Sequence, residues 1–232
     1  MMGTNVVAAK LAHFIDNGQV DSSHAVATAR VGAANAEAAI YGSAPWGPRR
    51  LAVEEALGAV RTAVYATLDL PRCPGDSTYG PFRVVYDPMP GVRPPIVLPH
   101  NSAAAYAPAG VILEADLSAD VAAWEQRGSL ATALRGLTAA AHDPAQWPTL
   151  LAAEDPTSAI EQDLIEVVVR DGKRPFATVR SVRVAEADFD AVMDVYLRNL
   201  SKSGTVELDD VEKAASRVAE AHVGGVLTLE LL

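Results

Sequence analysis

The stretch RTAVYATLDLPRCPGDSTYGPFRVVY (Arg61–Tyr86) decides the expected fold, because it holds two segments with strand character. Residues 64–68 and 82–86 are mostly β-branched or aromatic, which favours an extended and half-buried backbone. Proline and glycine at positions 71, 74 and 75 break the chain between them. Arg61 opens the first segment, where a guanidinium could hold a phosphate or a carboxylate.

The bulk composition is that of a folded, acidic chain. Its 232 residues are 50% hydrophobic, which is enough for the core of one large domain. No apolar run reaches the roughly 18–20 residues of a membrane span, and the N-terminus shows no secretion signal. The formal net charge of −10 opposes binding to nucleic-acid phosphates. We therefore expect no membrane or nucleic-acid partner, and a protein that is cytoplasmic or released without a visible secretion signal.

Helical and strand patterns alternate along the chain, which predicts an α+β fold with a mixed or antiparallel sheet. Helices are expected at the N-terminus, in the middle and at the C-terminus. We expect a single domain over 1–232, with a helical N-terminal arm (1–45), an α+β core (46–200) and a C-terminal helix and strand (201–232). Further strands are expected at 96–98, 111–115, 164–170, 178–184 and 226–231, and helices at 5–16, 25–40, 49–60, 120–141 (one or two helices), 147–153, 186–199 and 206–222.

The common catalytic and metal-binding motifs give no lead. The five histidines are scattered, and none has a histidine or cysteine at helical ligand spacing, so no metal site is expected. The sequence has no glycine-rich phosphate loop and no nucleophile elbow. The single cysteine, Cys73, lies in a loop without a nearby histidine, and we interpret it as incidental.

Glu166 is the most informative polar residue, because it lies in the strongest strand pattern, LIEVVVR (164–170). Alternation along the strand places Glu166 and Val168 on one face. A carboxylate among valines is costly to bury without a partner. Two interpretations remain open at this point. One is a solvated strand start or an ion pair with an arginine, and the other is a carboxylate that supports positive charge on a ribosyl centre.

Several segments, taken in order, resemble the mono-ADP-ribosyltransferase-like domains of bacterial toxins and some phage proteins. The family pattern runs from an arginine before an aromatic-led strand, through a Tyr-Gly pair before a second strand and a polar serine motif, to a late strand with a glutamate. The corresponding segments here are FIDNGQVDSSH (14–24), PWGPRRLAVEEAL (45–57), RTAVYATLDL (61–70), YGPFRVVYD (79–87), HNS (100–102), LIEVVVRDG (164–172) and VRSVRV (179–184).

The resemblance implies that NAD is the substrate, without a metal, and that ADP-ribose passes to an unknown protein acceptor or to water. Arg61 looks like the arginine that holds the phosphates or ribose of NAD, and Tyr65 like the aromatic residue that follows it. Ser102 matches the serine that braces the site. Glu166 looks like the catalytic glutamate that stabilises the oxocarbenium-like ribosyl species. Tyr79, of the Tyr-Gly pair, is implied in binding the cofactor.

The sequence also departs from the family pattern. These enzymes usually carry a second acidic or amide residue two positions from the glutamate, whereas those positions here are Leu164 and Val168. The alternative is therefore a catalytically inactive relative that acts as a protein-interaction or structural protein. In that case the acidic surface and the long helix expected near residues 207–222 would serve a protein partner.

Overall fold

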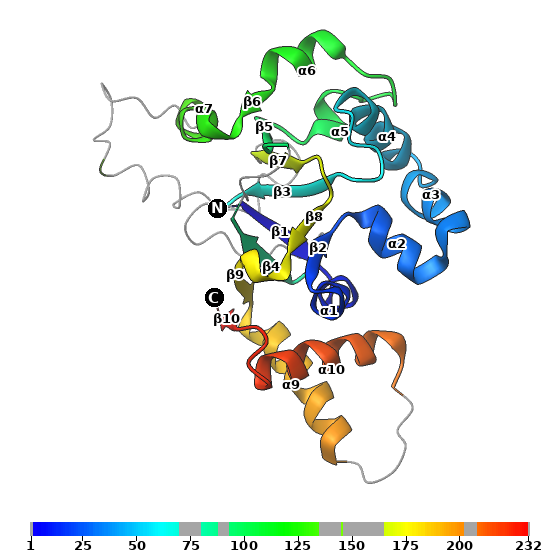
Figure 1. Ribbon diagram of the computed structural model, residues 1–232, viewed down its shortest axis with the longest axis vertical. Helices are drawn as coiled ribbons and strands as arrows, with labels where there is room; N and C mark the ends of the chain where they lie inside the picture. Colours follow the sequence, from blue (N-terminus) through cyan, green and yellow to red (C-terminus); the bar gives the residue numbers. More distant parts are fainter. Residues whose placement is uncertain are drawn as a thin grey trace.

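A computed structural model describes residues 2–69, 80–87, 93–134, 145, 165–201 and 208–231. Its centre is an eight-stranded sheet in the order β10–β9–β4–β1–β3–β7–β5–β6 (Figure 1). The β9–β10 pair is parallel and the other pairs are antiparallel, so the chain is α+β with a mixed, mostly antiparallel sheet, as expected. The strands are β1 (Met2–Val6), β3 (Val64–Leu68), β4 (Phe82–Tyr86), β5 (Ile96–Leu98), β6 (Ala122–Ala123), β7 (Glu166–Val169), β9 (Val179–Val184) and β10 (Leu229–Leu231).

The first strand of the chain lies in the middle of this sheet. β1 pairs with β4 on one side, where Thr4 lies opposite Val84, and with β3 on the other, where Gly3 lies opposite Thr67. The two strands of the Arg61–Tyr86 stretch are therefore both present, with β1 between them. A helical N-terminal arm was expected over residues 1–45, with a helix at 5–16; that helix is present as α1 from Ala8, and the preceding Met2–Val6 forms a strand that was not expected. Met2–Val6 is so short that its sequence pattern does not separate a strand from an extension of the helix that follows.

Helices surround the sheet, as Figure 1 shows. They are α1 (Ala8–Asn17), α2 (Ser23–Val31), α3 (Ala33–Tyr41), α4 (Trp46–Ala56), α5 (Ser102–Ala105), α6 (Glu114–Asp120), α7 (Arg127–Leu134), α9 (Glu186–Ser201) and α10 (Asp210–Val223). A separate two-stranded sheet joins β2 (Gln19–Asp21) to β8 (Lys173–Pro175). The segment 25–40 forms two helices, because Gly32 has φ 81° and interrupts the helix.

Two apolar clusters hold the sheet in place. On one face, strand residues such as Val84 and Val167 pack with Leu11 and Phe14 of α1 and with Val218 of α10. On the other face, around β5 and β7, a smaller cluster covers the strands with residues from α5, α6 and the loops beside them; its members include Leu98, Val168, Tyr106 and Leu117. Glu166 projects on this second face, because strand alternation places it on the same side as Val168.

Most other expected elements are present with shifted ends, and one is wrong. The strand expected at 111–115 is absent, since Glu114 begins α6 there. Its apolar residues Val111 and Leu113 are exposed, so they do not belong to a buried strand. The helix expected at 147–153 lies outside the described residues. Within the described ranges, every helix is too short or too polar to cross a lipid bilayer.

Candidate functional site

Glu166 opens β7 and lies inside the sheet, between Thr67 of β3 and Leu98 of β5. Only 6% of its surface is exposed. The backbone N–H of Ser102 donates a hydrogen bond of 3.3 Å to its Oε1. The structure therefore brings two of the predicted site residues, Glu166 and Ser102, into direct contact.

Ser102 reaches this position because it begins α5 directly after β5. Asn101 caps the helix, and its side-chain oxygen accepts a hydrogen bond of 3.2 Å from the backbone N–H of Ala104. The first amides of a helix have no partner within the helix, so the Ser102 N–H is available to the carboxylate. The Ser102 side chain is fully buried. Its hydroxyl makes no hydrogen bond of good geometry within the described residues. It nevertheless lies close enough to Glu166 to lower the pKa of that carboxyl group.

The ionisation of Glu166 is strongly perturbed. Burial raises its pKa from the usual 4.5 to about 7, because the charged carboxylate loses its hydration. The hydroxyl and N–H of Ser102 and the positive charge of Arg50 act in the opposite direction and lower this pKa. A buried carboxyl group that titrates near neutral pH is a common property of functional sites.

Tyr65 lies on the same face of the sheet, opposite Val168. The guanidinium carbon of Arg50 lies 4.8 Å from the centroid of the Tyr65 ring, which is a cation–π contact. Its hydroxyl is buried and has no hydrogen-bond partner within the described residues. Burial, followed by the nearby Glu54, raises the pKa of Tyr65 well above its ordinary value. The phenol is therefore a neutral hydrogen-bonding group beside Glu166 and Arg50.

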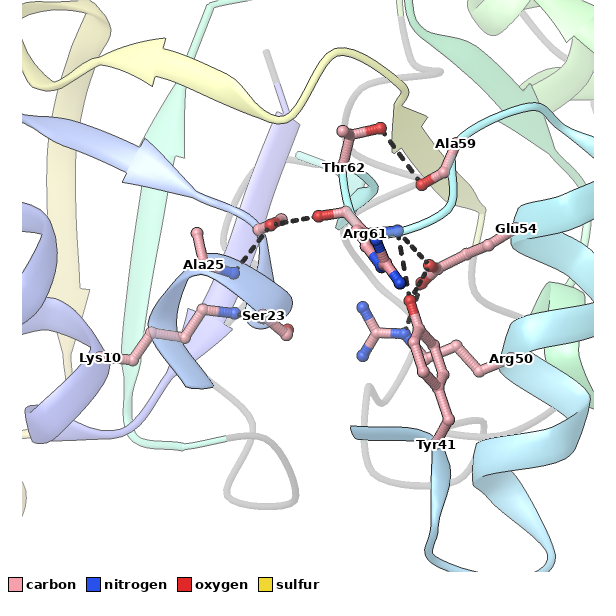
Figure 2. A network of polar contacts seen from close by, with 10 residues as sticks. Lys10, Ser23, Ala25, Tyr41, Arg50, Glu54, Ala59, Arg61 and Thr62 are labelled. Carbon is pink, nitrogen blue, oxygen red and sulfur yellow. Dashed lines mark hydrogen bonds and ion pairs between the residues drawn. The ribbon is translucent and has the colours of Figure 1, made fainter. Parts of the chain in front are cut away.

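Arg50 is held by a buried carboxylate on its own helix. Its Nε donates a hydrogen bond of 2.6 Å to Glu54, one helical turn further along α4. Glu54 is 1% exposed and also accepts a hydrogen bond of 2.5 Å from the hydroxyl of Tyr41. Arg50 keeps 24% of its side chain exposed. The ion pair thus fixes the Arg50 guanidinium at the boundary between the buried site and solvent (Figure 2).

Arg61 belongs to the turn before β3, where its backbone rather than its side chain contacts this network. Its φ of 66° is the left-handed conformation, which is unusual for a residue with a side chain. The Arg61 N–H donates to Glu54 at 3.2 Å, and the Arg61 carbonyl accepts a hydrogen bond of 2.8 Å from the Ser22 hydroxyl. The guanidinium forms an ion pair with Glu37, and 58% of the Arg61 side chain is exposed.

The predicted site residues are thus only partly brought together. Glu166 and Tyr65 share one face of the sheet, and Ser102 of α5 contacts Glu166, whereas the Arg61 guanidinium forms an ion pair with Glu37. The positive charge that acts on Glu166 comes from Arg50. Tyr79 lies outside the described residues.

Lys10 is a second cation beside Arg50. It extends from α1, and its Nζ lies 3.3 Å from the Ser23 hydroxyl and 5.7 Å from the centroid of the Phe14 ring. Burial, followed by the positive charge of Arg50, lowers the pKa of Lys10 from 10.5 to about 8. Figure 2 shows Lys10 and Arg50 extending toward one another from α1 and α4.

Sequence reasoning missed both Lys10 and Arg50. The Arg50–Glu54 spacing of four residues within an expected helix was a usable signal, because such pairs lie on one helix face. Lys10 also had a signal, since it interrupts an apolar helix pattern near Leu11 and Phe14.

Comparisons with protein-family models, with curated proteins and with solved structures find no match. Within the described ranges, no group of three or more histidine, cysteine, aspartate or glutamate residues is arranged to hold a metal ion. The groups available for chemistry at the site belong to Glu166 and its neighbours. These offer one carboxylate that titrates near neutral pH, one phenol and two cations.

Proposed function

We propose that this chain binds NAD and cleaves its nicotinamide–ribose bond, passing ADP-ribose to a protein acceptor or to water. The observation that carries the proposal is Glu166, a buried carboxylate held by the Ser102 N–H beside Tyr65 and Arg50. The resemblance to mono-ADP-ribosyltransferase-like domains suggested the same reaction with Glu166 in the same role. Arg50 here takes the role that the resemblance implied for Arg61.

The role of Glu166 is electrostatic. The bond from C1′ of the ribose to the pyridinium nitrogen breaks, and its electron pair leaves with nicotinamide, which becomes neutral. The ribosyl group left behind carries positive charge until an oxygen or nitrogen of the acceptor adds to C1′ and releases its proton to solvent. A fixed carboxylate in a site of low dielectric constant stabilises that charge more than water does.

The substrate itself favours the required form of Glu166. At neutral pH the carboxyl group of the free protein is only partly ionised, because its pKa is about 7. The nicotinamide ring of NAD carries a positive charge, and a positive charge close to a carboxyl group lowers its pKa. NAD binding is therefore expected to ionise the residue that assists the reaction.

Arg50 is suited to hold the pyrophosphate. Its guanidinium is partly exposed, lies over the Tyr65 ring and is kept in place by Glu54. A guanidinium offers paired donors that match phosphate oxygens. Binding the pyrophosphate at Arg50 would orient the dinucleotide with its nicotinamide ribose toward Glu166.

The direct test is incubation of the protein with labelled NAD, alone and with a cell lysate. Release of nicotinamide, with or without labelled lysate protein, is the expected result. A protein that neither releases nicotinamide nor labels any acceptor under both conditions would contradict the proposal.

The pH profile gives a further expected outcome. Since the ionised carboxylate is the useful form, kcat/KM for NAD should rise with increasing pH through about 7, the pKa of Glu166 in the free protein. The value of kcat should show the same rise at lower pH, because bound NAD lowers that pKa. Initial rates between pH 5 and 9 check both statements. A rate that falls as the pH rises through this range would show that the protonated form is the active one.

Arg50→Lys should raise the KM for NAD by about tenfold, because a lysine keeps the charge but not the paired donors. Arg49→Lys is the matched control, since Arg49 is the neighbouring residue of the same helix and lies over the exposed Trp46. Steady-state kinetics of both variants provide the measurement. Equal KM values for the two variants would remove Arg50 from the binding site.

A second candidate function is that of a protein-interaction module, and it rests on the hairpin of α9 and α10. Leu197 and Leu200 of α9 and Val211 of α10 are between 54% and 70% exposed. The hydrogen bond from Asn199 to Ser216 and the ion pair from Arg198 to Glu212 hold these two helices together. Exposed apolar residues that gather on one element are typical of protein-binding surfaces. This function predicts that Leu200→Glu abolishes binding to a protein partner without any effect on NAD.

A further inference from the structure

Lys10 is a half-buried cation without a counter-ion among the described residues. Its ammonium contacts the Ser23 hydroxyl at 3.3 Å and lies 5.7 Å from the centroid of the Phe14 ring. Within the described residues, no carboxylate forms an ion pair with it. A half-buried ammonium loses part of its hydration, and no carboxylate compensates for that loss here, so Lys10 is a candidate for binding an anion.

A second cation approaches Lys10 from the opposite side. The Nε of Arg50 is used by Glu54, and Figure 2 shows the remaining end of the guanidinium turned away from Glu54 toward Lys10. The positive charge of Arg50 is one of the two causes of the lowered pKa of Lys10. The two positive charges repel one another, and an anion between them would be attracted by both.

The first turn of α2 adds a third positive pole. Ser23, the hydrogen-bond partner of Lys10, is the first residue of this nine-residue helix. The Ser22 side chain accepts the hydrogen bond from the Ala25 N–H, and the first turn holds no acidic residue. Within the part of the chain that the structure describes, the backbone N–H groups of Ser23 and His24 have no acceptor. Helix N-termini of this kind bind phosphate groups.

The Tyr65 hydroxyl is a further polar group near Arg50. Its hydroxyl is buried without a hydrogen-bond partner among the described residues, and its ring lies under the Arg50 guanidinium. An unpaired buried hydroxyl carries a cost unless a further group accepts or donates a hydrogen bond there. A ligand that reaches Arg50 would also lie within range of this phenol.

We propose that Lys10, Arg50 and the first turn of α2 form a phosphate-binding site that takes the pyrophosphate of a nucleotide. The site lies near Glu166, because the Arg50 guanidinium lies over the ring of Tyr65, which shares a face of the sheet with Glu166. Binding of pyrophosphate does not depend on the proposed reaction. Only the further assignment, that the pyrophosphate belongs to NAD, rests on the proposed function.

The test uses inorganic pyrophosphate as the probe, with calorimetry on the whole chain. Wild-type protein should bind it, and Lys10→Met should weaken the affinity by about tenfold or more, because one charge-assisted contact is lost. Lys213→Met is the control, since Lys213 is 61% exposed and pairs only with Asp210 among the described residues. Equal affinities for the two variants, or no binding by the wild type, would overturn the proposal.

A second measurement needs no substitution. The wild-type protein is treated with a limiting amount of an amine-reactive acylating reagent. Peptide mass analysis then gives the extent of acylation of Lys10 and of Lys213 in the same sample. Pyrophosphate should slow acylation of Lys10 at least several-fold and leave Lys213 unchanged. Unchanged acylation at both lysines would contradict the site.

The outcomes for the phosphate site and for the reaction can be separated. Protection of Lys10 without any NAD cleavage would support the site and contradict the proposed function. NAD cleavage without protection of Lys10 would support the function and contradict the site.

Discussion

Glu166→Gln is expected to reduce NAD cleavage by a factor of about 100 or more, because glutamine has the shape of glutamate but no negative charge to place near the ribosyl cation. Nicotinamide release by the purified variant is the measurement. Glu125→Gln is a suitable control, since Glu125 is exposed on the surface. NAD turnover by the Glu166 variant equal to that of the wild type would end the proposed role of this residue.

The same substitution is expected to make the protein more stable at alkaline pH. Glu166 has a folded-state pKa of about 7 against an ordinary 4.5, so between these values the folded state binds a proton that the unfolded state has lost. The free energy of unfolding therefore falls as the pH rises from 4.5 to 7, by up to roughly 3 kcal/mol at about 1.4 kcal/mol per unit. Glutamine does not titrate, so the variant avoids this loss.

Denaturant unfolding at pH 5 and pH 8 measures the effect. The stability of the Glu166→Gln variant relative to wild type should increase from pH 5 to pH 8, and the Glu125→Gln control should show no such change. A variant that becomes relatively less stable toward pH 8 would contradict the burial of an uncompensated carboxylate. Gain of stability together with loss of activity would identify Glu166 as a residue kept for function at the expense of stability.

Glu54→Ala is expected to be the most destabilising of the substitutions considered, with a loss of about 3–5 kcal/mol. Glu54 accepts hydrogen bonds from Arg50, Tyr41 and the backbone N–H of Arg61. Its removal leaves a largely buried guanidinium without its carboxylate, together with an unpaired hydroxyl and amide. Chemical denaturation monitored by circular dichroism gives the change in free energy.

Glu37→Ala is the matched control for this experiment. Glu37 also binds Arg61, but through the side chain and at the surface, where 52% of the Glu37 side chain is exposed. Exposed ion pairs contribute about 1 kcal/mol or less, so this variant should unfold nearly as the wild type does. Similar losses for both variants would mean that the buried hydrogen bonds of Glu54 add nothing beyond a surface charge.

Much of the sheet was predictable from local sequence. The segments 82–86 and 96–98 form strands at the expected residues, and the LIEVVVR pattern contains β7. These segments are dense in β-branched residues, and their surroundings do not compete with strand formation. The order of the strands was not predictable, because the insertion of β1 between β3 and β4 depends on contacts between segments far apart in the chain.

The carboxylate of the candidate site, Glu166, was predictable from the sequence, whereas its cation, Arg50, was not. Glu166 could be recognised because a carboxylate inside a valine-rich strand must have a reason to be there. Arg61 was placed at a strand start, but its left-handed backbone turns it toward Glu37 instead. That conformation is fixed by Glu54 and Ser22 from other elements, which no local pattern records. The cation near Glu166 is instead Arg50 of α4, a helix to which the resemblance gave no site residue.

The central place of β1 has a consequence for how the chain acquires its structure. β1 is the earliest described strand, yet both of its partners follow only after residue 63. Pairing between such distant segments forms slowly, because the intervening chain must first be closed into a loop. During synthesis on the ribosome, Met2 and Val6 therefore emerge long before the strands that bury them. We expect Met2–Val6 to stay unpaired in the nascent chain until residues 64–86 have been synthesised.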